Sequence, residues 1–268
     1  MVSTPMAPAE DKPGLVVRGR PRPWVMSHRG AWKHAPENSL AAFGIALEQG
    51  ADMLETDLWF SADGEIVCHH DATLERMTGD PRRVADVTAH ELEGVDLRGC
   101  PRGLRHGTPR LADLLELVPP PVVLMLEIKD PRFAEPARAR QLAAVLGERA
   151  ARRLVGVLSR DHNLLRVLAQ ATPGLVTGHI SYANPLGSAD TDLLGPYWPL
   201  LRLNPWYVAR AHHRGQLVCP LDPNLHRRLG TYLKMDVDAL LTDDPAETRR
   251  LIDELRRQQT ARATGAPR

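Results

Sequence analysis

The stretch Asp52–Asp71 reads DMLETDLWFSADGEIVCHHD and carries the clearest indication of the fold class. Its first part, Asp52–Asp57, is predicted to be a β-strand. Successive strand residues point to opposite faces, so the carboxylates of Glu55 and Asp57, two residues apart, point to the same side. The stretch therefore predicts a strand that presents a pair of acids.

The same stretch contains a hairpin signal. Asp63-Gly64 favours a two-residue type I′ turn, which would fold the following residues back along the strand. A regular hairpin around this turn places Asp57 opposite His70. A β-bulge would shift that register by one residue.

Short apolar runs alternate with helical segments along the rest of the chain, which is typical of βα units and a parallel sheet. The eight predicted strands are Trp24–Ser27, Asp52–Asp57, Val122–Ile128, Leu154–Leu158, Leu175–Ile180, Leu200–Leu203, Gln216–Leu221 and Ala239–Thr242. Several are almost wholly apolar, as strands buried on both faces are. Eight such units predict an α/β fold of the TIM (β/α)8 barrel type, with its chemistry at the carboxyl ends of the strands.

Polar residues gather at those predicted strand ends. They are His28 at the first, Glu55 and Asp57 at the second, Glu127 and Lys129 at the third, Ser159 at the fourth, Asp222 at the seventh and Thr242-Asp243 at the eighth. The predicted topology therefore brings the candidate functional groups to one face of the barrel.

The bulk composition limits the class of protein. A chain of 268 residues with 43% hydrophobic content suits one barrel domain. The net charge of +1 gives no reason to expect a nucleic-acid partner. The three cysteines (Cys68, Cys100 and Cys219) are odd in number and lack metal-type spacing, which favours a reducing compartment, the cytoplasm.

The sequence also predicts the domain organisation. We expect a disordered leader over residues 1–20, the barrel over 21–258 and a loose tail over 259–268. Residues 71–107 form a short insertion after the second strand's hairpin, expected to be a loop or small cap over the barrel mouth. Its six arginines make it locally basic: Arg76, Arg82, Arg83, Arg98, Arg102 and Arg105. No apolar run is long enough for a secretory signal or a transmembrane helix, so we expect no stable membrane association.

The order of short motifs resembles the glycerophosphodiester phosphodiesterase family, over roughly residues 23 to 255. The motifs are His28-Arg29-Gly30, Pro36-Glu37-Asn38-Ser39, Glu55-Thr56-Asp57, Asp63-Gly64, His70-Asp71, Glu127-Ile128-Lys129 and Thr242-Asp243-Asp244-Pro245. The resemblance implies a TIM barrel, a bound divalent cation, and hydrolysis of glycerophosphodiesters to glycerol 3-phosphate and an alcohol. It also implies attack on phosphorus by water or by the substrate's own glycerol 2-hydroxyl, through a cyclic phosphate in the second case.

Glu55, Asp57 and Glu127 are the expected metal ligands. Three carboxylates that converge repel one another unless a cation lies between them. Hard oxygen ligands favour one Mg²⁺ or Ca²⁺ ion over zinc, and the sequence leaves the choice between those two ions open.

His28 and His70 are the expected catalytic residues. Phosphodiester cleavage removes a proton from the attacking oxygen and gives one to the leaving alkoxide, and histidine titrates in the range that serves both steps. The sequence does not assign acid and base between them. The family's HD motif selects His70, so His69 is expected to be structural.

The remaining site residues have supporting roles. Arg29 and Lys129 are expected to bind phosphate oxygens. Glu37 and Asn38 are expected to order the His28 loop, and Asn38 or Ser39 can cap a helix from about Leu40 to Gln49.

Two departures from the family pattern concern the substrate. Ser39 stands where threonine is usual, and the strand Val218–Asp222 lacks an aromatic and ends in Asp222 where asparagine is common. The metal and the histidines are unaffected, but the identity of the alcohol group, like the oligomeric state, stays open.

Other functions remain as alternatives. One is a lysophospholipase D or a phosphodiesterase for a specialised metabolite, and a lipid enzyme would need an exposed apolar rim at the barrel mouth. The insertion, rich in arginine, proline and glycine, weighs against that rim. The other is a non-catalytic barrel that binds a small molecule, although each motif position needed for chemistry is filled.

Overall fold

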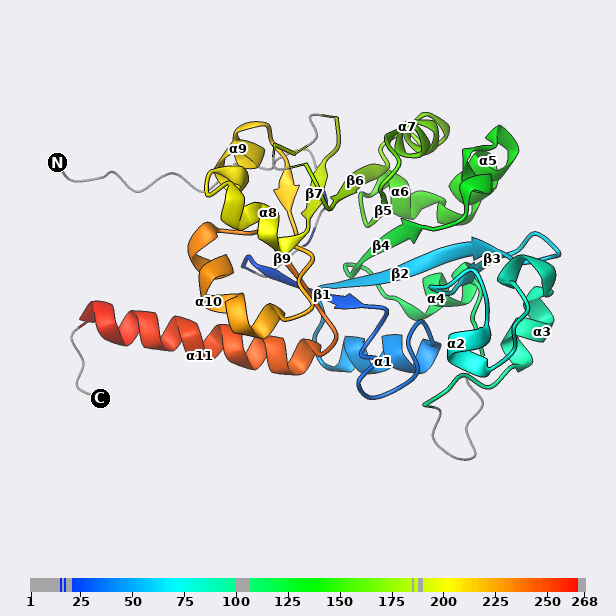
Figure 1. Ribbon diagram of the computed structural model, residues 1–268, viewed down its shortest axis with the longest axis horizontal. Coiled ribbons are helices and arrows are strands. Elements are labelled where there is room, and N and C mark those ends of the chain that lie inside the picture. The colour runs from blue at the N-terminus through cyan, green and yellow to red at the C-terminus, as the bar shows by residue number, and fades with distance from the viewer. Residues whose placement is uncertain are drawn as a thin grey trace.

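The computed structural model describes residues 15, 17, 21–99, 107–184, 186–187 and 190–264, and its core is a barrel of parallel strands (Figure 1). The strands are β1 (Trp24–His28), β2 (Met53–Phe60), β3 (Ile66–Cys68), β4 (Val123–Ile128), β5 (Val155–Ser159), β6 (Val176–Ser181), β7 (Leu193–Pro196), β8 (Leu217–Val218) and β9 (Ala239–Thr242). Eight are parallel, in the order β8-β7-β6-β5-β4-β2-β1-β9, and β3 pairs antiparallel with β2. The predicted TIM-barrel fold is confirmed.

Helices surround the strands (Figure 1). They are α1 (Leu40–Glu48), α4 (Leu111–Leu117), α5 (Pro136–Leu146) after the 3₁₀ turn η2 (Pro131–Ala134), α6 (Glu148–Ala151), α7 (His162–Ala171), α8 (Trp198–Leu203), α9 (Tyr207–His213), α10 (Leu225–Met235) and α11 (Pro245–Thr264). Within the described ranges, none combines the length and the apolar composition that a membrane crossing requires.

Three aspartates fasten the amino-terminal end of the barrel: Asp52, Asp192 and Asp238 each directly precede a strand. Their carboxylates accept backbone N–H groups of neighbouring strands at 2.8 Å, from Val25, Thr177 and Val218 respectively. The backbone N–H of Asp238 also donates to the Val218 carbonyl at 2.9 Å, which joins β9 to β8 and nearly closes the barrel. Because these contacts lie at the end opposite the strands' carboxyl termini, the fold is secured away from the predicted site.

The sixth predicted strand, Leu200–Leu203, is wrong. These residues end helix α8, and the strand at this place in the barrel is β7. A run of four apolar residues fits a strand or a buried helical turn equally well. Pro199 in the first turn of α8 favours the helix, whereas Gly195 gives β7 little strand propensity.

The predicted hairpin register is also wrong, by one residue. The turn is a three-residue loop, closed by the Ser61 N–H donating to the Glu65 carbonyl at 2.9 Å, with Gly64 at φ +82°. A glycine in this left-handed conformation is typical of three-residue hairpin loops. The His69 N–H therefore meets the Asp57 carbonyl, at 2.9 Å, and the following residue lies just beyond the ladder.

The insertion forms a small cap packed on the β2–β3 hairpin. It contains α2 (Glu75–Thr78), the 3₁₀ turn η1 (Val84–Asp86) and α3 (Ala89–Gly94) around a separate apolar cluster. Two of its described arginines form ion pairs: Arg76 with Glu37 and Asp71, and Arg82 with Asp80. The description of this segment as basic is wrong, because seven acids accompany the six arginines: Asp71, Glu75, Asp80, Asp86, Glu91, Glu93 and Asp96.

Both chain ends differ in part from expectation. Most of the predicted leader, residues 1–14, 16 and 18–20, lies outside the described residues, but Leu15 is buried in the apolar cluster that includes Trp24. Helix α11 continues to Thr264, so residues 259–264 are helical rather than loose. Alanine, arginine and glutamine favour helix at this end, and the 265–268 segment is outside the described residues.

Candidate active site

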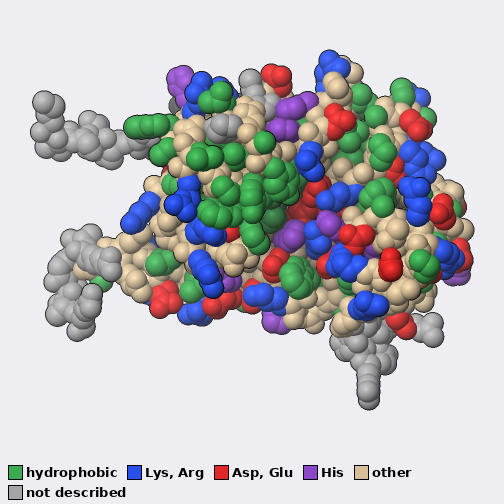
Figure 2. Space-filling view, in the orientation of Figure 1, with side chains coloured by type: hydrophobic (Ala, Val, Ile, Leu, Met, Phe, Trp, Pro, Cys, Tyr) green, Lys and Arg blue, Asp and Glu red, His purple; other side chains and the backbone are tan. Residues whose placement is uncertain are grey.

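A pocket of about 640 Å³ opens at the carboxyl ends of the strands. One side, the polar half, is formed by His28, Arg29, Glu55, His70, Glu127 and Lys129. The other side, the apolar half, is formed by Leu158, Ile180, Leu193, Tyr197, Cys219 and Leu221. Figure 2 shows hydrophobic side chains gathered beside a group of acidic, basic and histidine side chains on this face.

The carboxylates of the polar half converge. Asp57 on β2 is the register partner of Glu127 on β4, and Glu55 lies two residues earlier on the same face of β2. One oxygen from each of these three residues lies within 4.8 Å of the others. Burial raises the pKa of Glu55 well above its usual range, and the charges of Asp57 and Glu127 raise it further.

Two cations offset part of this negative charge. The Lys129 ammonium lies 2.6 Å from Glu127 and 3.2 Å from Asp57. The Arg29 guanidinium lies 3.2 Å from Asp57, and the Arg29 backbone N–H donates to Glu55 at 3.2 Å. Burial opposes the charge on Lys129, but Asp57 and Glu127 outweigh it and raise the pKa of the lysine.

The cluster fits a divalent cation. Asp57 Oδ1 is buried and, although Lys129 is close, it accepts no hydrogen bond from any residue in the described part of the chain. Lys129 offsets one of the three convergent negative charges, so a cation bound at the lone pairs of this oxygen would lower the remaining repulsion. The donor set is made of oxygen atoms alone, which suits Mg²⁺ or Ca²⁺.

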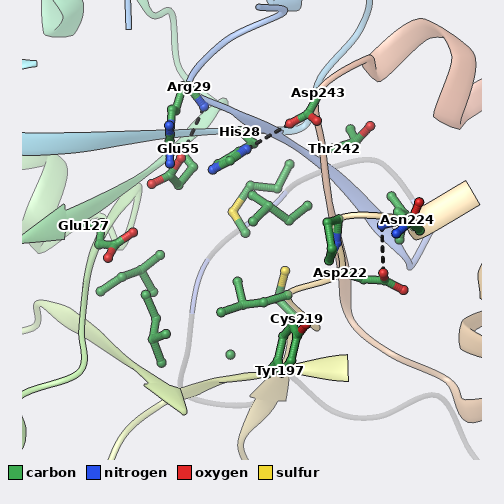
Figure 3. Close-up of a pocket in the computed structure, with 18 of the residues that line it drawn as sticks. His28, Arg29, Glu55, Glu127, Tyr197, Cys219, Asp222, Asn224, Thr242 and Asp243 are labelled. Carbon is green, nitrogen blue, oxygen red and sulfur yellow. Dashed lines mark hydrogen bonds and ion pairs between the residues drawn. The ribbon is translucent and has the colours of Figure 1, made fainter. Parts of the chain in front are cut away.

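His28 is held by a carboxylate from the other end of the chain. Strands β1 and β9 pair in parallel, and this brings His28 Nδ1 to 2.9 Å from Asp243 Oδ1 (Figure 3). Burial works against ionisation of Asp243, but the hydrogen bond and charge of His28 prevail and lower the pKa of that carboxyl. With Nδ1 engaged, Nε2 is the ring nitrogen left for chemistry.

His70 has an equivalent partner. Its Nδ1 lies 2.8 Å from Asp71 Oδ1, and Arg76 holds the other oxygen of Asp71 at 2.5 Å. Burial again opposes ionisation of Asp71, yet the hydrogen bonds from His70 and Arg76 lower the pKa of the carboxyl. His28 and His70 therefore each have an aspartate on Nδ1.

His69 is placed differently. It is buried, its Nε2 lies 3.3 Å from the Thr73 carbonyl, and its Nδ1 lies 3.4 Å from the Thr108 hydroxyl. Burial lowers the pKa of His69, which favours the neutral ring. The pocket lining includes His70, and these contacts of His69 lie within the packing of the cap.

The loop after β1 is shaped for its contacts. Arg29 and Gly30 both have positive φ, +55° and +81°, and a Cβ on Gly30 would lie 2.7 Å from Ala42. Only glycine adopts such a close approach without displacing its neighbour. The left-handed turn aims the Arg29 side chain at Glu37 and at the acid cluster.

Asn38 orders the acid cluster and does not cap the helix. Its amide donates to Asp57 Oδ2 at 3.1 Å and accepts from the Thr56 hydroxyl at 2.8 Å. Ser39 is the N-cap of α1, because its hydroxyl accepts the Ala42 N–H at 3.2 Å.

Glu37 binds two arginines of the site. It accepts hydrogen bonds from Arg29 at 3.1 Å and from Arg76 at 2.5 Å. Burial opposes the charge of Glu37, but the arginines lower the pKa of the carboxyl.

Asp222 lies at the boundary between the two halves and is fully engaged. Arg228 donates to both of its oxygens at 2.7 and 2.9 Å, and Tyr232 donates a third bond at 2.6 Å. The Asn224 N–H adds a fourth at 2.8 Å (Figure 3). The aspartate thus makes a charge-assisted pair with Arg228, and an asparagine at this position would bind that arginine less strongly.

Several functional contacts were not predicted. His226 was not among the candidate residues, yet it lines the pocket and lies 2.8 Å from the Thr248 hydroxyl. The side chain of Trp32 binds Asp243, and the indole of Trp59 donates to the His70 carbonyl at 3.2 Å. No sequence signal marks these contacts, because they depend on strands and loops far apart in the chain.

A charged, histidine-bearing pocket at the carboxyl ends of a parallel (β/α)8 barrel is the arrangement of TIM-barrel enzymes. A sequence model of the Glycerophosphoryl diester phosphodiesterase family matches residues 28–247. The chain therefore belongs to this family, whose members are phosphoric diester hydrolases.

Known proteins agree with this placement. A glycerophosphodiester phosphodiesterase of Caldanaerobacter subterraneus is 29% identical over 241 residues, which cover 82% of this chain and 94% of the relative. A putative glycerophosphoryl diester phosphodiesterase of Silicibacter pomeroyi has a similar crystal structure, with TM-score 0.77, 27% identity and coverage of 89% and 96%. A phosphodiesterase of Oleispira antarctica, solved with the product sn-glycerol-3-phosphate, shares the fold with TM-score 0.75, 23% identity and coverage of 86% and 97%.

Proposed function

We propose that this chain is a divalent-cation-dependent phosphodiesterase that hydrolyses glycerophosphodiesters to glycerol 3-phosphate and an alcohol. The observation that carries the proposal is one pocket that is lined by two aspartate-bound histidines and by Glu55 and Glu127, whose carboxylates converge with that of the buried Asp57. The product held by the Oleispira antarctica relative supports the glycerol phosphate part of the substrate.

Glu55, Asp57 and Glu127 would hold the cation, Mg²⁺ or Ca²⁺. When bound, the ion supplies positive charge that offsets the charge of the phosphate as the reaction proceeds. Arg29 and Lys129 already carry positive charge beside these carboxylates and line the pocket, so they are placed to bind the phosphate oxygens.

His28 and His70 would carry the two proton transfers. One Nε2 takes a proton from the attacking hydroxyl as its oxygen bonds to phosphorus, and the other gives a proton to the alkoxide as the second P–O bond breaks. Asp243 and Asp71 hold the opposite ring nitrogens, which fixes the tautomers. The attacking hydroxyl belongs to water or to the glycerol 2-position, and detection of a cyclic glycerol phosphate during turnover distinguishes the two.

The free, buried thiols of Cys68 and Cys219 support the expected reducing, cytoplasmic location. A small phosphodiester, rather than a nucleic acid, is the proposed partner because the pocket is enclosed by the barrel and the chain has a net charge of only +1.

Chelation tests the proposal. Exhaustive EDTA treatment should lower the hydrolysis of a glycerophosphodiester by on the order of 10² or more, and added Mg²⁺ or Ca²⁺ should restore it. The same ions should raise the melting temperature of the wild type but not of the Glu55→Gln variant, in which one proposed ligand is neutral.

Full activity after chelation would contradict the metal requirement. If the ions raised the melting temperature but no ester were hydrolysed, the non-catalytic binding barrel would be the better interpretation.

A further inference from the structure

We propose that the apolar half of the pocket binds an apolar substituent of the phosphodiester, an alkyl chain or an aromatic ring. This inference rests on the proposed function, because the polar half is what would hold the phosphate. It revises the expectation, drawn from the arginine, proline and glycine content of the insertion, that the barrel mouth lacks an apolar rim.

The apolar half is deep and continuous with the interior of the barrel. Leu158, Ile180, Leu193 and Cys219 are buried members of one apolar cluster inside the barrel, and each also lines the pocket. In Figure 3, Cys219 and Tyr197 lie across the pocket from Glu55 and Arg29. A substrate whose phosphate meets the acid cluster therefore extends one of its ester arms against apolar walls.

Gly195 keeps this space open. An added Cβ at Gly195 would meet no atom closer than 3.6 Å, whereas at Gly156 it would lie 2.8 Å from Met125 and at Gly178 2.4 Å from Leu158. The last two glycines are required for close packing of strands. Gly195 lines the pocket without that requirement, so its missing side chain leaves room that a ligand can fill.

Aromatic side chains continue the apolar half toward solvent. The rings of Tyr182 and Tyr197 have centroids 5.4 Å apart, and Tyr197 and Trp198 have centroids 6.2 Å apart. Tyr182 is 53% exposed and still lines the pocket. This is the apolar rim that a lipid-like substrate needs, and it lies just after strands β6 and β7 rather than on the insertion.

The rim does not favour a cationic alcohol such as choline. Aromatic faces bind quaternary ammonium groups, but Arg160 already lies over Tyr182 at 5.1 Å and Arg228 over Trp198 at 3.6 Å. Each arginine lies over one ring, Tyr182 or Trp198, and its positive charge repels a further cation at the rim.

The carboxylates offer a cation no better partner. Among described residues that line the pocket, they are Glu55, Glu127, Asp222 and Asp243. Glu55 and Glu127 belong to the metal cluster, Asp222 is bound by Arg228, and Asp243 is bound by His28. A neutral apolar group is therefore the better fit.

A series of alkyl esters tests the inference. The ethyl, butyl and hexyl esters of glycerol 3-phosphate differ only in methylene groups and are compared with glycerophosphocholine in the presence of Mg²⁺ or Ca²⁺. Each methylene that becomes buried is expected to raise kcat/KM about three- to fourfold. We expect the hexyl ester to exceed both the ethyl ester and glycerophosphocholine at least tenfold.

A second pair of substrates shows which ester arm of the phosphodiester, glycerol or alcohol, occupies the apolar half. Hexanoyl lysophosphatidylcholine carries the apolar group on the glycerol, and the hexyl ester carries it on the alcohol. A gain confined to the lysophospholipid assigns the subsite to the glycerol arm, and a gain confined to the hexyl ester assigns it to the alcohol arm.

Two substitutions should remove the gain. Gly195→Leu fills the apolar half and should lower the hexyl-to-ethyl ratio of kcat/KM at least tenfold. Leu221→Asp puts a carboxylate at its half-exposed edge and should shift preference from the hexyl ester toward glycerophosphocholine. Leu203→Ala is the matched control, because this leucine is 75% exposed on α8 outside the pocket and should leave the ratio unchanged.

Two results together would overturn the inference and leave the proposed function standing. They are a flat or falling wild-type series from ethyl to hexyl, and no gain of the hexanoyl lysophospholipid over glycerophosphocholine. Absence of turnover with every ester would instead overturn the proposed function. In that case calorimetric binding of the hexyl and ethyl esters still decides the subsite, since equal affinities contradict it and a tenfold preference for hexyl supports it.

Discussion

The polar and apolar halves of the pocket are held in place by different forces. In the polar half, each group that could do chemistry has a charged partner, as in the pairs His28–Asp243 and Lys129–Glu127. In the apolar half, Ile180 and Leu193 are fixed by packing of neighbouring strands inside the barrel. The difference predicts that changes in the polar half act on kcat, and that changes in the apolar half act on the choice of substrate.

The largest effect is expected from the histidines of the polar half. His28→Ala and His70→Ala should each lower kcat by on the order of 10² or more, because a positioned acid or base typically contributes 10²–10⁴-fold. His69→Ala should change kcat much less, since His69 contacts Thr73 and Thr108 within the cap. Steady-state kinetics of the three variants, each shown to be folded by circular dichroism, measures this.

If a folded His69→Ala variant lost turnover while His70→Ala kept it, the assignment of His70 would be wrong.

A smaller effect is expected from the aspartate behind His28. Asp243→Asn keeps the shape of the side chain but removes a charge-assisted hydrogen bond, which is worth about 1.5–3 kcal/mol. We expect kcat to fall about ten- to a hundredfold while the hexyl-to-ethyl preference stays as in the wild type. A changed hexyl-to-ethyl preference at constant kcat would contradict the assignment of kcat to the polar half and of substrate choice to the apolar half.

The smallest effect is expected for the pH dependence of folding stability, through His179 near the apolar half. His179 on β6 is buried, and its ring stacks on that of His162 with centroids 3.8 Å apart. Burial lowers the pKa of His179 below its usual 6.5, and the charge of His162 lowers it further. The unfolded chain therefore binds a proton more readily, so the folded state loses stability as the pH falls below about 6.5.

His179→Phe should reduce this loss between pH 7 and pH 5, by no more than about 1.4 kcal/mol per pH unit for one proton. Urea denaturation of wild type and variant at both pH values measures it. His90→Phe is the control, because the His90 side chain is 92% exposed. An identical pH dependence in wild type and His179→Phe would show that His179 is not the group that titrates.

The sequence predicted the acid cluster well because its geometry is local. Glu55 and Asp57 are two residues apart on a strand, and Glu127 is the last residue but one of the adjacent strand β4, so strand periodicity and barrel topology bring them together. Asp243 was noted only as a strand end. Its contact with His28 depends on pairing of the first and last strands, which no short motif encodes.

The apolar half could not be predicted for another reason. It depends on the absence of a side chain at Gly195 and on strand β7. That strand was not predicted, because the apolar run Leu200–Leu203 indicated the sixth strand instead. The hairpin register failed because the difference between a two- and a three-residue loop at Asp63-Gly64 is decided by the Ser61–Glu65 hydrogen bond. Charged residues can be recognised in a sequence as candidates for catalysis, whereas an empty volume corresponds to no particular residue and cannot be recognised.

The pairing of His28 with Asp243 spans 215 positions of the chain, and it has a consequence for biosynthesis. At typical translation rates of about 5–20 residues per second, a growing polypeptide carries His28 for roughly 10–40 s before Asp243 is made. Strand β9, which both pairs with β1 and joins β8, is added in the same final stage. Barrel closure and the His28–Asp243 pair therefore arise together, and a chain that ends before Asp243 lacks both.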